Sequence, residues 1–355
     1  MAANTFLAGD VGGTKTLLAV YGQREGQLQA LYSQRYRSGE WSCLESIVHH
    51  FLSSLPADLP RPKTSCLAVA GPVQNGTATL TNLPWVLSET LLCDATGLKH
   101  LELVNDFAVL IHGLPHLDDQ QQVVLQEGHP SRSATLTHGG AVAVVGAGTG
   151  LGMARGIPGP HGWLAVASEG GHREFAARTE DEWQLASWLK ADLDLDRLSV
   201  ERIVSGTGLG HVMRWRLQQP DAVGHPLQRA AEAWRSQPVD SKAYQDLPAL
   251  TDQAAQSGDP LARQALDLWL GAYGSAAGDL ALQELCSGGL WIGGGTAAKH
   301  LKGLQSATFL EPMRSKGRFR AFIDGLRVHA VIDANAGRFS AACRARDLAT
   351  EIEST

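Results

Sequence analysis

The residues with the clearest chemical potential lie in a glycine-rich stretch near the start of the chain. Asp10 stands two residues before the run Gly12, Gly13, Thr14 and Lys15. Adjacent glycines allow a backbone to approach an anion closely, and their N–H groups can donate hydrogen bonds to phosphate oxygens. A carboxylate beside such a turn suits Mg²⁺, which keeps several waters and binds one or two carboxylates together with phosphates. The pattern therefore predicts a phosphate site at this turn.

This turn is not a Walker loop. That motif ends in Gly-Lys-Ser/Thr and leads into a helix, whereas Thr14 precedes Lys15 in this chain. The residues that follow, 17–21, are apolar and favour a strand. We therefore expect a strand, a glycine-rich turn and a returning strand, with the phosphate cradle at the tip of a β-hairpin. Lys15 is either a further phosphate contact or a solvated strand residue.

A second stretch, residues 141–157, repeats this pattern. An apolar run leads into a Gly/Thr turn at 146–152, and a second apolar run follows. A dinucleotide-binding fingerprint is disfavoured because Leu151 stands where its third glycine should be, and no helix follows. We expect a second hairpin cradle with Gly148 and Thr149 at its tip. Two similar cradles in one chain suggest a duplicated domain with a nucleotide between the copies.

A third glycine cluster follows a short apolar strand. Gly293, Gly294 and Gly295 lead to Thr296, which we expect to cap a helix. Bare glycines at a helix N-terminus permit close approach of a flat or anionic ligand.

A long helix is expected just before this cluster, begun by Asp259 and Pro260. Gly271, Gly274 and Gly278 fall near one of its faces. Close helix packing and a nearby nucleotide explain these glycines about equally well.

The candidate catalytic carboxylate is Asp106. A strand runs through Val104, and Asn105 and Asp106 follow it before a short helix. Ligands collect at the carboxyl ends of strands in α/β sheets, so Asp106 is placed to accept a proton from a substrate hydroxyl. The alternative is that Asp106 only caps the helix, and one carboxylate can do both.

The composition is that of a soluble globular protein. The 355 residues are 44% apolar and 19% charged, enough for two lobes of roughly 150–200 residues each. The net charge of −6 is spread without the clustered basic face of a nucleic-acid-binding protein. No apolar run reaches the roughly 20 residues of a membrane span, and no secretory signal is visible. The five dispersed cysteines indicate reduced thiols and a cytoplasmic protein.

Taken in order, the motifs resemble the bacterial glucokinase family, within the hexokinase–actin–Hsp70 type of fold. The stretches GDVGGTKT and GAGTGLG are similar to the first and second phosphate motifs of this family, and WIGGGTAAK is similar to its adenosine motif. The segments LTNLPW, VNDF, SEGGH and ERIVSGTGLG are similar to the sugar-side segments of the family. The cysteine-rich zinc motif of the wider group of sugar kinases and repressors is missing after Gly171.

The resemblance implies an α/β fold of two lobes. Each lobe is a ribonuclease-H-like mixed β-sheet flanked by helices, with the active-site cleft between the lobes. Residues 1–112 and 335–355 are expected to form the small lobe, and residues 113–334 the large lobe. Residues 114–131 are expected to be a turn-rich connection and hinge, and residues 218–248 a peripheral insert or interface.

The resemblance also implies a function. The chain is expected to be a cytoplasmic glucokinase that transfers the γ-phosphoryl group of ATP, with Mg²⁺, to the 6-hydroxyl of glucose, feeding glycolysis. Its expected partners are glucose and ATP, with neither nucleic acid nor membrane, and a homodimer is a family-level expectation. A kinase of another hexose or of an amino sugar, such as mannose or glucosamine, stays open. A sugar-sensing regulator on this fold would need a helix-turn-helix before Phe6.

The resemblance assigns roles to individual residues. Asp106 is the base, and Asp10 holds Mg²⁺ through water. The expected sugar ligands are Asn82, Asn105, Asp106, Glu169, His172 and Glu201. The expected ATP ligands are Asp10, Gly12, Gly13, Thr14, Gly148, Thr149, Gly293, Gly294 and Gly295. From their residue types alone, Glu169 and His172 favour recognition of adjacent hydroxyls over a metal pair, since no third ligand lies nearby in the sequence.

Overall fold

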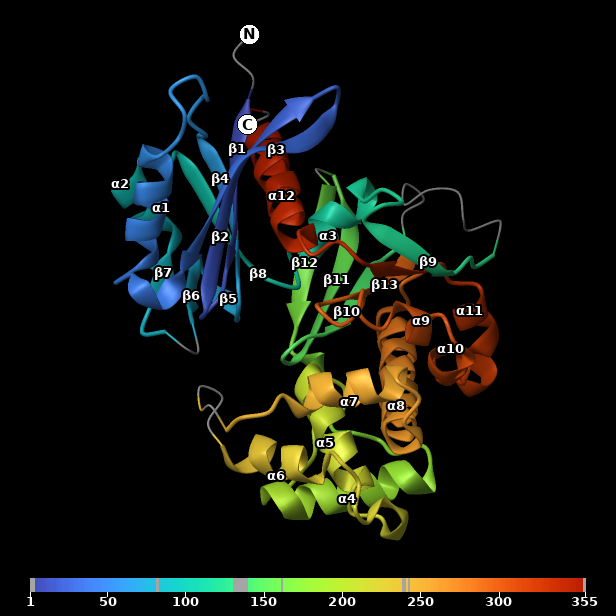
Figure 1. Cartoon of the computed structure of the whole chain (residues 1–355). Coiled ribbons are helices and arrows are strands. Elements are labelled where there is room, and N and C mark those ends of the chain that lie inside the picture. Colours follow the sequence, from blue (N-terminus) through green and yellow to red (C-terminus); the bar gives the residue numbers. More distant parts are fainter. Residues whose placement is uncertain are drawn as a thin grey trace.

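The computed structural model describes residues 4–80, 83–129, 140–160, 162–237, 241 and 243–353 (Figure 1). Two mixed β-sheets form its centre, and α12 (Ala336–Glu353) lies between them. The predicted α/β class and the two sheets with flanking helices are confirmed.

The first sheet contains five strands in the order β3-β2-β1-β4-β8. Their bounds are β1 Thr5–Val11, β2 Lys15–Arg24, β3 Gln27–Arg37, β4 Thr64–Val69 and β8 His100–Asn105. The first three pair antiparallel as consecutive hairpins, and β1, β4 and β8 run parallel. The connection from β4 to β8 includes α2 (Glu89–Thr96) and a small sheet of β5 Val73–Gln74, β6 Thr77–Thr79 and β7 Val86–Ser88. Helix α1 (Leu44–Ser53) lies between β3 and β4 in the chain and packs against α2.

The second sheet has the order β12-β11-β10-β13-β14-β9. Its strands are β9 Gln122–Gln126, β10 Val142–Ala147, β11 Leu151–Gly159, β12 Gly162–Ser168, β13 Gly289–Gly293 and β14 Val328–Val331. From β12 to β14 it repeats the arrangement of the first sheet, with two antiparallel hairpins followed by two parallel strands. This shared order is the duplication that the two cradles suggested. The predicted connection 114–131 is not wholly turns, because β9 pairs antiparallel with β14 at the sheet edge.

The remaining helices mostly surround the second sheet, and four of them extend the molecule below it in Figure 1. Those four are α4 Glu180–Leu193, α5 Gly206–Arg216, α6 Gln228–Ser236 and α7 Leu247–Gln256. The others are α3 Leu110–Gly113, α8 Pro260–Glu284, α9 Leu301–Leu304, α10 Ala307–Arg314 and α11 Arg320–Asp324. In the described part of the chain, no helix is both long and apolar enough to cross a membrane.

Helix α8 packs against α5, α7, α10 and β10. It begins as the sequence predicts, because the Asp259 side chain accepts a hydrogen bond from the backbone N–H of Ala262 and Pro260 occupies the first turn. A Cβ at Gly274 would lie 2.0 Å from the carbonyl oxygen of Phe309 in α10. A Cβ at Gly278 would lie 2.2 Å from the next turn of that helix, at Met313. The glycines therefore serve close helix packing, which decides between the two explanations.

The core of the molecule joins the two sheets through α12. One cluster of buried side chains includes Ala8 and Cys66 from the first sheet, Val142 and Val144 from the second, and Ala341 from α12. Helix α12 packs against β1 and β4 of the first sheet and against α3, and α3 in turn contacts β10, β11 and β12 of the second sheet. The division into lobes at residues 112 and 335 stays a prediction.

Candidate active site

The first sheet brings Asp10 and Asp106 to the same edge. Strands β1, β4 and β8 are parallel, with Val11 paired to Val69 and Val69 paired to Asn105. Their carboxyl ends therefore lie side by side, which is where ligands bind in open α/β sheets. The backbone N–H of Asp106 donates to the carbonyl of Val69 at 3.0 Å and continues the sheet pairing by one residue.

The environment of Asp106 raises its pKa to about 6. Burial is the largest cause, and the negative charges of Asp10 and Glu169 raise the pKa further. Hydrogen bonds from the N–H groups of Phe107 and Asp106 act in the opposite direction. A carboxylate with a pKa near neutrality is better suited to accept a proton than one at its ordinary value.

Asn105 positions this carboxylate. Its Oδ1 accepts hydrogen bonds from the N–H groups of Phe107 and Ala108, each at 3.0 Å. Its Nδ2 donates to the carbonyl of Gly71 at 3.1 Å and to Oδ1 of Asp106 at 3.2 Å. The sequence left open that Asp106 serves only as a helix cap. In the structure, the side chain of Asn105 accepts the hydrogen bonds from the N–H groups of the turn that leads to α3. Both ends of the Asn105 amide are engaged, so its role as a sugar ligand stays a prediction.

The turn after Asp106 packs onto the second sheet at two glycines. A Cβ at Gly152 would lie 2.0 Å from Cδ2 of the Phe107 ring, and one at Gly156 would lie 2.4 Å from Cγ2 of Ile111. Both glycines lie on β11, four residues apart, and so on the same face of the strand. No sequence pattern indicated that the last glycine of the second cradle receives a ring from the catalytic turn.

The first cradle is a β-hairpin turn, as expected. The Gly12 N–H donates to the carbonyl of Lys15 at 2.9 Å and closes the turn. Ser38, which the sequence interpretation missed, supports it from just beyond β3: its Oγ donates to the Gly12 carbonyl at 2.7 Å, and its N–H donates to the carbonyl of Thr14. Gly13 is half-buried, whereas Thr14 and Lys15 are exposed.

Asp10 lies just before this turn and is half-buried. Burial raises the pKa of Asp10, and the positive charges of Lys15 and Arg338 lower it. Arg338 belongs to the first turn of α12, far away in sequence, and no sequence pattern pointed to it.

The second cradle is held by side chains from three other segments. Glu201 Oε2 accepts a hydrogen bond from the Leu151 N–H at 2.8 Å. The Tyr273 hydroxyl accepts one from the Ala147 N–H at 3.0 Å, and Thr296 Oγ1 donates to the Ala147 carbonyl at 2.7 Å. The two bonds to Ala147 satisfy its backbone groups on the β13 side, because the pairing of β10 with β13 ends one residue earlier, at Gly146.

A cavity of about 660 Å³ opens beside this cradle. It is lined by Gly148 and Thr149 on one side and by Gly295 on another. Gly294 has a positive φ of 80°, and a Cβ there would lie 2.8 Å from the Ala147 carbonyl oxygen. Gly293 is buried in β13. Gly295 therefore faces the cavity, whereas Gly293 and Gly294 let the chain pass close behind the cradle.

Residues 218–248 were expected to form a peripheral insert or interface, and this stays a prediction. Three residues of this segment, Trp234, Tyr244 and Pro248, also line the cavity. The segment carries no glycine motif, so the sequence did not indicate this contribution.

The remaining sugar-side candidates lie after β12. Glu169 Oε2 and His172 Nε2 are 3.7 Å apart, and both side chains are exposed. The negative charge of Glu169 contributes to the raised pKa of Asp106, as the last of its causes. Within the described residues, no group of three His, Cys, Asp or Glu side chains could hold a metal, so this pair is not part of such a cluster. Asn82 lies outside the described residues.

The profile of the glucokinase family matches residues 7–348. The chain belongs to the glucokinase family. A glucokinase from Synechocystis sp. is 38% identical over 348 residues, which cover 95% of this chain and 96% of that protein.

Two solved structures are similar to this family member. A glucokinase from an Antarctic psychrotroph superposes with a TM-score of 0.80 at 28% identity, covering 97% of this chain and 99% of the other. A ROK family glucokinase from Streptomyces griseus, in complex with glucose and AMPPNP, superposes with a TM-score of 0.57 at 20% identity, covering 97% and 99% of the two chains. The second likeness supports the fold alone.

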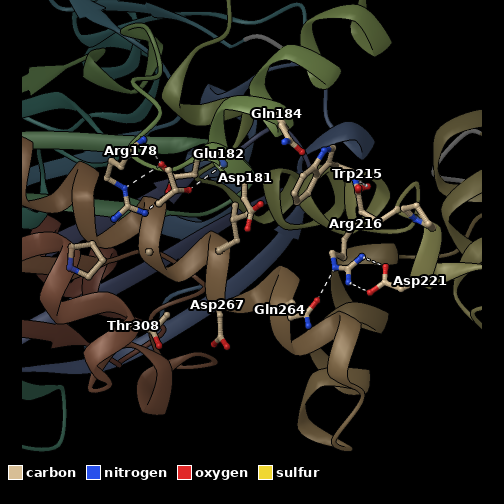
Figure 2. Close-up of a pocket in the computed structure, with 16 residues that line it drawn as sticks. Arg178, Asp181, Glu182, Gln184, Trp215, Arg216, Asp221, Gln264, Asp267 and Thr308 are labelled. Carbon is tan, nitrogen blue, oxygen red and sulfur yellow. Dashed lines mark hydrogen bonds and ion pairs between the residues drawn. The ribbon is translucent and has the colours of Figure 1, made fainter.

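A larger hollow, of about 840 Å³, lies between α4, α5, α8 and α10 (Figure 2). None of the predicted site residues lines it. Its two arginines are already engaged, Arg178 with Glu182 and Arg216 with Asp221, and Arg216 also donates to Gln264. This hollow is larger than the cavity beside the second cradle, but the phosphate turns and the carboxylates lie elsewhere. We therefore place the active site with the turns and the carboxylates.

The contact between Phe107 and Gly152 gives the first prediction. In Gly152→Ala the new Cβ displaces the ring and with it the Asp106 turn, so we expect kcat for glucose phosphorylation to fall about tenfold or more. The KM for ATP should change less than about threefold. Steady-state kinetics on protein shown by circular dichroism to be folded provide the measurement. Phe107→Leu in the same chain should restore part of the rate, and full activity in Gly152→Ala alone would contradict the prediction.

The raised pKa of Asp106 gives the second prediction. A base must be ionised, so kcat/KM for glucose should be constant above neutrality and fall about tenfold per pH unit below about 6. The pH–rate profile provides the measurement. In Glu169→Gln the acidic limb should move to lower pH, because the Glu169 charge raises this pKa. A wild-type profile that stays constant down to pH 5 would show that Asp106 is not the titrating base.

Proposed function

We propose that this chain is a glucokinase that transfers the γ-phosphoryl group of ATP to the 6-hydroxyl of glucose, producing glucose 6-phosphate and ADP. The observation that carries the proposal is the half-buried Asp106 carboxylate, with a pKa raised to about 6, at the sheet edge that also carries Asp10. Membership of the glucokinase family is in agreement with it.

In this proposal Asp106 accepts the proton of the 6-hydroxyl as the hydroxyl oxygen attacks the γ-phosphorus. Such a base contributes about 10²–10⁴-fold, and the rest of the rate comes from positioning and from charge neutralisation. Asn105 holds Asp106 in place and contacts a neighbouring hydroxyl. Glucose is further bound by Glu169, His172, Glu201 and Asn82.

The two cradles bind the triphosphate. The turn of Gly12, Gly13 and Thr14 contacts the transferred phosphoryl group, and Gly148 and Thr149 contact the β-phosphate. Closing of the small lobe (1–112 and 335–355) on the large lobe (113–334) excludes water and aligns donor with acceptor.

Mg²⁺ suits the residues around Asp10. A half-buried carboxylate beside a phosphate turn supplies one oxygen ligand, and the described residues offer no fuller set of protein ligands. That is the donor set expected for an ion that binds mainly phosphates and water. When bound, Mg²⁺ neutralises charge on the transferred group. Asp10 would hold the ion through water.

The nucleoside is assigned to the cavity beside the second cradle. Its volume of about 660 Å³ is within the usual range for small-molecule sites. Tyr244 and Pro248 provide one wall, and Gly295 with the adjoining Lys299 and His300 provides the other. Burial lowers the pKa of His300, whereas the charge of the neighbouring Asp252 raises it. ATP is the proposed donor, in keeping with the AMPPNP complex of the Streptomyces griseus protein.

A cytoplasmic location agrees with the five free cysteines, because disulfides are rare in reducing compartments. A homodimer stays a family-level prediction, which sedimentation or light scattering of the purified chain would test.

The experiment that tests this proposal is ADP release with Mg-ATP and a panel of sugars. We expect the highest kcat/KM for glucose, lower values for mannose, fructose, galactose, glucosamine and N-acetylglucosamine, and no stimulation by 6-deoxyglucose, which lacks the accepting hydroxyl. A sugar that exceeds glucose would show that the substrate assignment is wrong. Failure of every sugar to stimulate turnover would contradict the kinase proposal itself.

A further inference from the structure

Glu201 touches the second phosphate turn directly. It lies in the 3₁₀ turn Val200–Arg202, and its Oε2 accepts the Leu151 N–H at 2.8 Å. A Cβ at Gly150 would lie only 2.4 Å from the same oxygen. The carboxylate therefore rests against the backbone of the turn, and Gly150 is small enough to allow it.

The segment that carries Glu201 is bonded to this turn at a second point. It continues into α5, whose first residue, Gly206, donates its N–H to the Gly148 carbonyl at 2.7 Å. The hydroxyl of Thr207 donates to the carbonyl of Thr149 at 3.3 Å. The segment that begins at Glu201 is therefore bonded to both residues proposed to contact the β-phosphate.

The two oxygens of Glu201 differ in their surroundings. Oε2 is held by Leu151, whereas Oε1 accepts no hydrogen bond from the part of the chain that the structure describes. The side chain is half-buried, so Oε1 can receive a donor from the cleft. Glu169, the other sugar-side glutamate, pairs with His172 instead and makes no such contact with the turn among the described residues.

We propose that Glu201 is a positioning residue that couples sugar binding to ATP binding. A sugar hydroxyl donates to Oε1 and fixes the carboxylate, which strengthens the hold of Oε2 on Leu151 and orders the turn that receives the β-phosphate. Glucose thereby tightens ATP binding, and ATP tightens glucose binding by the same factor. The inference rests on the proposed function, because it takes glucose and ATP as the ligands.

The test is calorimetric titration with Mg-AMPPNP, with and without saturating glucose. For the wild type we expect glucose to increase the affinity for AMPPNP about fivefold or more, within the usual range of coupling. In Gly150→Ala the new Cβ moves the carboxylate off the turn without removing it. Glucose binding should weaken as well, because the displaced Glu201 is itself a proposed sugar ligand, but at saturating glucose the effect on AMPPNP affinity should fall below about twofold, against about fivefold or more in the wild type.

Two variants serve as matched controls. Glu169→Gln weakens glucose binding but keeps the contact with the turn, so the full coupling should return at saturating glucose. Tyr273→Phe removes the bond to Ala147 on the other side of the turn, so it should weaken AMPPNP binding equally with and without glucose. Glu201→Gln keeps an oxygen for Leu151 and should retain more coupling than Glu201→Ala.

Two results would overturn the inference. They are a wild-type protein in which glucose leaves AMPPNP affinity unchanged, and a Gly150→Ala variant that couples as strongly as wild type. Both leave glucose binding and turnover intact. They are therefore distinguishable from failure of the proposed function, in which wild-type protein neither binds nor phosphorylates glucose.

Discussion

The site depends on the burial of two carboxylates at one edge of a parallel sheet. Asp10 and Asp106 lie at the ends of strands separated only by β4, and the charge of Asp10, together with burial, raises the pKa of Asp106. Burial disfavours the ionised form, and so does a like charge nearby. The result is a base that is ionised at neutral pH yet protonates only slightly below it. A metal ion beside Asp10 would relieve the repulsion when it is bound.

Glycine positions make this arrangement possible between two sheets. The catalytic turn reaches the second sheet because Gly152 leaves room for Phe107, and the second cradle approaches the glycine cluster because Gly294 lacks a side chain. The site therefore lies between two copies of one arrangement, in which a hairpin is followed by parallel strands. In the first copy these strands lead to Asp10 and Asp106, and in the second β13 leads to the glycine cluster. Lobe movement would change the spacing of the copies while leaving each cradle intact.

Much of this was predictable from the sequence because the pattern is local. The two hairpin cradles, the strand that ends at Asp106 and the helix begun by Asp259 are each defined within about 20 residues by glycine, apolar and capping patterns. The residues that were missed act across long distances in sequence. Ser38, Arg338, Tyr273 and Trp234 reach the site only after the sheets and helices have assembled, and no local pattern distinguishes them from ordinary core or surface residues. Asn105 was found, but the number of hydrogen bonds that it makes within the protein was not foreseeable.

The most direct test of the catalytic role of Asp106 is the rate of glucose phosphorylation by Asp106→Asn, measured together with the affinity of this variant for glucose. The asparagine preserves the shape of the side chain but cannot accept the hydroxyl proton. We predict that kcat falls by about 10²–10⁴-fold while the dissociation constant for glucose stays within a few-fold of wild type. A variant that turns over at close to the wild-type rate would contradict both the assignment of Asp106 as the base and the functional importance of its buried position.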